Sequence, residues 1–146
     1  MKTTKYHVWE PLKGISDNLD YIEFKFAKGL QLEFEDRDGN EINFIYDQLI
    51  NGMFVWASRF TEESIRGDID QLALQARINH FNSENKSWCL YKVSNSDFLE
   101  WYDELPGPGS DLYPEVEHHV FMSSEIIFDV LSEYEPKVIV KPKEKR

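Results

Sequence analysis

Residues 21–46 read YIEFKFAKGLQLEFEDRDGNEINFIY, and this stretch decides the fold class. Apolar and polar residues alternate in three runs, which is typical of strands with one buried face: residues 21–26, 30–34 and 41–46. The dipeptide Lys28-Gly29 and the segment 36–40, which reads DRDGN, separate these runs and predict tight turns. The sequence therefore predicts an antiparallel meander.

The phase of the alternation predicts which side chains face the core. A further apolar run at 53–58 predicts a fourth strand of the meander, which would have one dry face and one wet face. The apolar positions of these strands, and of a later strand at 88–93, are therefore expected to be largely buried: Phe24, Phe26, Leu32, Phe34, Phe44, Trp88 and Leu90.

The pattern changes to helical spacing after residue 61. The stripe predicts a helix over 69–80, preceded by a short turn, because its apolar members recur every three or four residues: Ile65, Ile69, Leu72 and Ala76. Asp68 is the expected N-cap, with Gln71 three residues later.

The remaining chain alternates short elements with one long irregular loop. Ser94 and Asp97 have capping-box spacing ahead of a short helix at 98–102. Two prolines and two glycines exclude regular structure at 105–111, and strands are expected afterwards at 119–122, 126–131 and, as an edge strand, 138–140.

These elements predict a single α+β domain over residues 1–140. Its sheet would be mainly antiparallel, formed by the N-terminal meander and the C-terminal strands, and packed with one or two helices. Residues 141–146 are expected to form a basic, flexible tail.

Composition narrows the class of protein. Of 146 residues, 41% are apolar and 14% aromatic, which suffices for a core. The sequence has no secretory signal pattern, no apolar run that could span a membrane and one cysteine, so we expect a cytoplasmic protein. A formal net charge of −11 opposes binding to nucleic acid or anionic membranes and favours a basic protein partner, although acidity can also serve solubility alone.

No motif indicates catalysis. Asp36, Asp38 and Asn40 match the start of a calcium loop, but the required glycine is misplaced, and a hairpin turn explains them. His118 and His119 would point to opposite faces of a strand and cannot chelate one ion, although one of them can belong to the core. Cys89 lies in an apolar run and is expected to be buried and inert, so we expect no enzyme activity, no metal and no cofactor.

The segment 100–117 is the candidate partner-binding surface. It interleaves aromatic and acidic residues around the irregular loop, a pattern that suits recognition of a basic protein. The alternative is that the aromatic residues belong to the core and the acidic ones are merely solvated. The candidate residues are Trp101, Tyr102, Asp103, Glu104, Asp111, Tyr113, Glu115 and Glu117.

The C-terminal half resembles a known group of small proteins. The likeness is carried by residues 87–96 (SWCLYKVSNS), 98–101 (FLEW), 118–122 (HHVFM) and 129–138 (DVLSEYEPKV). These segments resemble immunity, or antitoxin, proteins of Gram-positive bacteria that are encoded beside secreted polymorphic toxins. The resemblance implies a cytoplasmic protein that blocks its toxin by stoichiometric binding, without a cofactor.

We therefore expect an immunity-type protein that binds and blocks a basic toxin such as a nuclease, as a monomer or weak dimer. Two alternatives stay open. One is a structural or regulatory adaptor with another protein partner, and the other is a small hydrolase whose site has no sequence signature. A deep pocket with converging carboxylates or histidines would favour the hydrolase.

Overall fold

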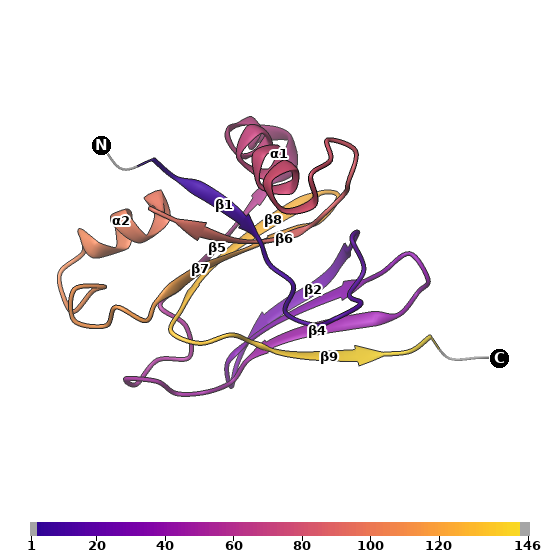
Figure 1. Cartoon of the computed structure of the whole chain (residues 1–146). Helices are drawn as coiled ribbons and strands as arrows, with labels where there is room; N and C mark the ends of the chain where they lie inside the picture. Colours follow the sequence, from indigo (N-terminus) through magenta and orange to yellow (C-terminus); the bar gives the residue numbers. More distant parts are fainter. Residues whose placement is uncertain (1–2, 144–146) are drawn as a thin grey trace.

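Two antiparallel sheets pack face to face in the computed structural model, which describes residues 3–143 (Figure 1). One sheet has five strands in the order β1-β6-β7-β8-β5, and the other has four in the order β2-β3-β4-β9. The strands are β1 (Lys5–Val8), β2 (Asp20–Phe26), β3 (Leu30–Glu35), β4 (Glu41–Tyr46), β5 (Ala57–Glu62), β6 (Leu90–Ser94), β7 (Glu117–Met122), β8 (Ile126–Ser132) and β9 (Lys137–Lys141). The expected α+β class with mainly antiparallel pairing is confirmed.

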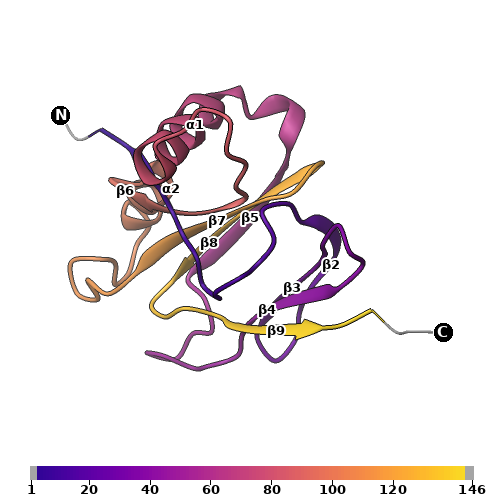
Figure 2. The same cartoon turned by 45° about the vertical axis from the view of Figure 1, so that its right-hand side comes forward.

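Both helices lie on the outer side of the five-stranded sheet (Figures 1 and 2). Helix α1 (Gly67–Phe81) follows a short 3₁₀ turn (Glu63–Ile65), and α2 (Asp97–Asp103) follows β6. The five-stranded sheet is therefore covered on both faces, by helices on one and by the second sheet on the other.

The predicted meander β2-β3-β4 is confirmed, and its two turns have clear physical causes. Gly29 has a φ of 114°, and a Cβ there would lie 2.3 Å from the carbonyl oxygen of Tyr46. In the second turn the Asp36 carboxylate accepts hydrogen bonds from the backbone N–H groups of Asp38 and Asn40, each at 2.9 Å. The residues that resemble a calcium loop thus close a hairpin, as expected.

The fourth strand of this sheet is not the predicted one. Its place beside β4 is taken by β9, an edge strand that corresponds to the expected 138–140. Residues 53–56 lie outside the strands, and β5 pairs with β8 in the other sheet. Alternation identifies a strand but not its neighbours, so the sequence could not assign this strand to a sheet.

The predicted buried set is partly wrong. Leu32, Phe34, Phe44 and Leu90 are fully buried, and Trp88 is half-buried. Phe24 and Phe26 pair with Leu32 and Leu30 and share their inner face, but they are 38% and 61% exposed. The reason is that β2 is the last strand of its sheet, where the facing sheet does not cover it fully.

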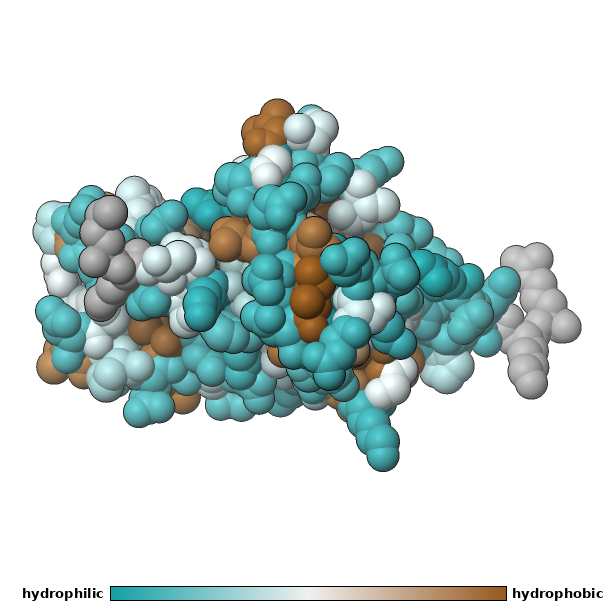
Figure 3. All heavy atoms as spheres, turned by 45° about the horizontal axis from the view of Figure 1, so that its top comes forward, coloured by the Kyte–Doolittle hydropathy of each residue, from teal (hydrophilic) through white to brown (hydrophobic). Residues whose placement is uncertain are grey.

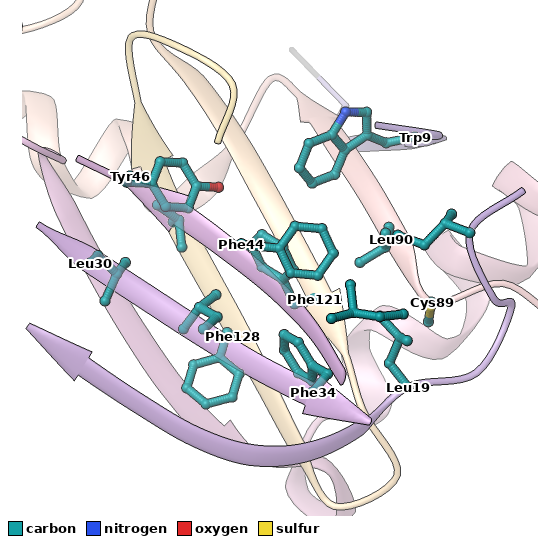
Figure 4. Packing of buried hydrophobic residues seen from close by; sticks show 14 residues of the cluster. Trp9, Leu19, Leu30, Phe34, Phe44, Tyr46, Cys89, Leu90, Phe121 and Phe128 are labelled. Carbon is teal, nitrogen blue, oxygen red and sulfur yellow. The ribbon is translucent and has the colours of Figure 1, made fainter. Parts of the chain in front are cut away.

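The main core lies between the sheets. Aromatic rings from both layers meet there: Phe34 and Phe44 of one sheet pack on Phe121 of the other, with ring centroids 6.0 and 4.8 Å away (Figure 4). Cys89 is buried in this core, as expected, and burial raises the pKa of its thiol to about 12.

Helix α1 contains the predicted 69–80 and begins two residues before it. Ile69, Ala73 and Ala76 are buried against the outer face of the five-stranded sheet, whereas Ile65 precedes the helix and is exposed. Asp68 is not the N-cap but a first-turn residue whose carboxylate binds the Arg66 guanidinium at 3.0 Å.

The ends of the chain also differ from expectation. Alternation did not predict β1, which pairs with β6. At the other end Lys141 belongs to β9, and the backbone N–H of Lys143 donates to Asn40 Oδ1 at 3.0 Å, so the structured part extends beyond the expected bound at residue 140. Residues 144–146 of that tail lie outside the described part. Within residues 3–143, no helix is long and apolar enough to cross a membrane.

Candidate functional site

The candidate site is built on α2. Strand β6 ends at Ser94, Asn95 adopts a left-handed conformation with a φ of 52°, and the chain then enters the helix. The Ser96 hydroxyl caps it by accepting from the backbone N–H of Leu99 at 3.0 Å. The expected capping box of Ser94 and Asp97 is therefore wrong by two residues, because Asn95 bends the chain and leaves Ser96 at the N-cap.

The irregular loop after α2 is fastened to the helix. Asp103 accepts hydrogen bonds from the backbone N–H of Ser110, at 2.8 Å, and from the Ser110 hydroxyl. Inside the loop, the N–H groups of Leu112 and Tyr113 both donate to the carbonyl oxygen of Gly109 at 3.1 Å. The loop is thus held in one arrangement beside the C-terminal end of α2.

The predicted aromatic anchors divide into two groups. Trp101 is 50% exposed and stacks on Phe98 with ring centroids 5.6 Å apart. Tyr102 and Tyr113 instead pack on Trp56, at 5.0 and 6.3 Å between ring centroids, and are half-buried. Of the predicted aromatic anchors, Trp101 is therefore the one with a largely exposed ring. The two tyrosines fit the alternative stated above, in which the aromatic residues pack against the core.

A groove of about 840 Å³ runs along α2, between the helix, the end of β6 and the loop. Four carboxylates line it, because their spacing places them on one side of the helix: Asp97, Glu100, Asp103 and Glu104. Two of them sit at the C-terminal end, where the helix dipole disfavours negative charge. Asp103 is explained by its bonds to Ser110, whereas the structure gives exposed Glu104 no such role.

A chain of buried polar side chains borders this groove. His118 bonds the Ser96 hydroxyl through Nδ1 at 2.6 Å and Asp129 through Nε2 at 2.7 Å. The other oxygen of Asp129 accepts from Arg59 at 2.9 Å and from Arg66 at 3.3 Å. Burial opposes ionisation of Asp129, but the hydrogen bond and charge of His118 and the charge of Arg59 lower the pKa of this carboxyl to about 2.

Ser96, His118 and Asp129 have the residue types of a nucleophilic triad, but the charge environment of the aspartate differs from that of a triad. In a triad the carboxylate is free to stabilise the imidazolium, but here two guanidinium groups already balance Asp129. The Ser96 oxygen is also engaged as the cap of α2. Both facts favour a structural role, in which the array joins α2 to β7 and β8.

Glu117 belongs to a second network, on the opposite face of β7. Its carboxylate binds His119 Nε2 at 3.0 Å and Lys92 Nζ at 3.1 Å, and these hydrogen bonds lower its pKa to about 2. His119 Nδ1 lies 2.7 Å from the Tyr46 hydroxyl, and burial lowers the pKa of the imidazole. The two histidines thus face opposite sides, as expected, and both are buried.

The structure therefore brings together only part of the predicted surface. Trp101 and Asp103 lie on α2 and Glu104 is its C-cap, while Asp111 and Glu115 are exposed on the following loop. Glu117 is separated from them. Sequence reasoning missed Ser96, His118 and Asp129 as a unit, although a charged residue inside the apolar run 126–131 was a visible signal.

Among the described residues, no group of three or more histidine, cysteine, aspartate or glutamate side chains could hold a metal ion. Comparison with known proteins finds no family model, no curated protein and no solved structure that matches this chain.

Proposed function

We propose that this protein is a cytoplasmic, immunity-type inhibitor that binds a basic protein, such as a nuclease toxin, through α2 and the loop that follows it. The observation that carries this proposal is the groove with four carboxylates along α2, the helix that also bears the exposed ring of Trp101. Carboxylates can occupy the positions of substrate phosphates on a basic partner, and an exposed aromatic ring supplies apolar contact area.

Two further features support a protein-binding role for this surface. The loop is fastened by Asp103, so binding would not require ordering of a long segment, which lowers the entropic cost of association. The net charge of −11 extends the negative field beyond the groove and would accelerate the approach of a basic partner.

The kinetic test needs a purified partner, identified by pull-down and mass spectrometry. Reversing Glu100, Glu104 and Asp111 to Lys should slow association and flatten its salt dependence, because these charges act before contact. Trp101→Ala should mainly accelerate dissociation, since the ring acts only in the complex.

The matched control reverses three exposed carboxylates outside this surface, Glu63, Asp70 and Glu84, with the same change in net charge. This variant should retain more of the wild-type association rate than the α2 variant does. Equal slowing by both variants would show that net charge alone drives association, and unchanged binding in the α2 and Trp101 variants would remove this surface from the interface.

A small hydrolase is the second candidate, and the Ser96–His118–Asp129 chain at the groove is the observation that favours it. A fluorophosphonate probe should label wild-type protein and not Ser96→Ala if Ser96 is a nucleophile. An unlabelled wild-type protein would leave the array with its structural role.

A further inference from the structure

An aromatic patch lies where the free edges of the two sheets meet. Phe24 of β2 packs against Phe60 of β5, with ring centroids 5.3 Å apart, and Phe60 is 56% exposed. Phe26, farther along β2, contacts Phe54 at 6.3 Å. By contrast, the face that carries α1 is mostly hydrophilic, with apolar residues in small separate areas (Figure 3).

Strand β2 presents an open backbone edge at this patch. It is the last strand of its sheet, and six consecutive residues, Glu23–Lys28, are exposed. A register irregularity between Tyr21 and Glu23 precedes a regular stretch that extends to Phe26. An exposed edge strand with apolar side chains is a template for pairing with another strand.

The charges along β2 are complementary to those of a second copy of the same strand. If two β2 strands pair antiparallel about Phe24, Glu23 of each copy lies opposite the partner's Lys25. Pairing about Lys25 instead would place two lysines opposite each other, so the charges select the register centred on Phe24.

The other free edge of the same sheet lacks this property. Self-pairing of β9 about Ile139 would place Lys137 opposite the partner's Lys141, and Pro142 follows directly. Like charges and proline both oppose edge pairing. We propose that the protein forms a twofold dimer through antiparallel pairing of β2 with β2, which joins the two four-stranded sheets and buries Phe24 and Phe26.

Charge exchange tests this register. Sedimentation of wild-type protein over a concentration series should show a monomer–dimer equilibrium. Glu23→Lys and Lys25→Glu should each weaken the dimer about tenfold, because each places two like-charged pairs across the interface. The double variant restores opposite charges and should recover the wild-type affinity, and an equimolar mixture of the two single variants should form a heterodimer.

The control is Lys86→Glu, which makes the same charge change as Lys25→Glu in the exposed loop after α1 and should leave the dimer unchanged. A wild-type protein that stays monomeric at its highest soluble concentration would overturn the proposal. So would a dimer that withstands both single substitutions, since its interface would lie elsewhere. Neither outcome affects the α2 surface, which lies on the other sheet.

Discussion

At the scale of single residues, burial depends on what covers a position as well as on the direction in which it points. Phe44 and Phe26 both face the inner side of the four-stranded sheet. Phe44 lies on a central strand and is fully buried, whereas Phe26 lies on the edge strand and is mostly exposed. Their identical chemistry makes them a matched pair for measuring this difference.

Phe44→Ala should lower the free energy of unfolding by about 3–5 kcal/mol, because it leaves a cavity among Trp9, Phe34 and Phe121. Phe26→Ala should cost well under half of that, since its ring keeps most of its exposure to water in the folded protein. Urea unfolding of both variants, monitored below the concentration at which any dimer forms, gives the comparison. Similar losses would mean that Phe26 is covered in solution.

Asp129 shows what a single residue in the sequence could have revealed. It is a charged residue in the middle of the apolar run 126–131, where both neighbours are buried, and such a position demands partners. The sequence could not say which partners, because His118, Arg59 and Arg66 come from three other segments. The sequence could therefore predict that Asp129 has polar partners, but not which residues they are.

At the scale of elements, alternation and helical spacing located most strands and both helices. These patterns did not determine which strands pair. The strand that was expected to extend the meander, β5, pairs with β8 in the other sheet, and β9 pairs with β4 instead. The helix starts also differ from the predicted ones: the Ser96 side chain caps α2, whereas α1 begins after Arg66 without a side-chain capping hydrogen bond. The groove depends on these choices, because it lies between α2, the end of β6 and the loop, so no sequence pattern could have predicted it.

The loop after α2 provides an element-scale prediction. Asp103→Ala removes both hydrogen bonds to Ser110 and should free the loop while leaving the sheets intact. Amide hydrogen exchange should therefore accelerate at Ser110, Leu112 and Tyr113, with little change in β7 and β8. Asp111→Ala is the control, because it removes an exposed carboxylate of the same loop. Equal acceleration in both variants would show that Asp103 does not hold the loop.

At the scale of the whole molecule, three buried or half-buried groups connect folding stability to pH with the same sign. His119 has a pKa lowered by burial from 6.5, and Glu117 and Asp129 have pKa values lowered to about 2 from 4.5 and 3.8. In each case the unfolded chain binds protons at a higher pH than the folded protein does. The contribution of these three groups to the free energy of unfolding is therefore fully present above their unfolded pKa values, and it is lost as the pH falls through and below them.

The pH profile should accordingly fall in two stages. The first begins near pH 6.5, where His119 of the unfolded chain takes up a proton, and the second begins near pH 4.5, where Glu117 and then Asp129 follow. The Asp129 contribution lost by pH 2 is on the order of 2 kcal/mol. Urea unfolding at a series of pH values measures both stages.

His119→Gln separates the two stages, because glutamine has no proton to gain in this range. The variant should be less stable than the wild type at neutral pH, since it loses the bond to Tyr46 or to Glu117 and the stacking on Trp9. Its stability should nevertheless stay level from pH 7 to the onset of the carboxylate stage. A fall near pH 6.5 that persists in this variant would assign the first stage to another group. Asp129→Asn, in turn, should leave the first stage intact and make the second one shallower.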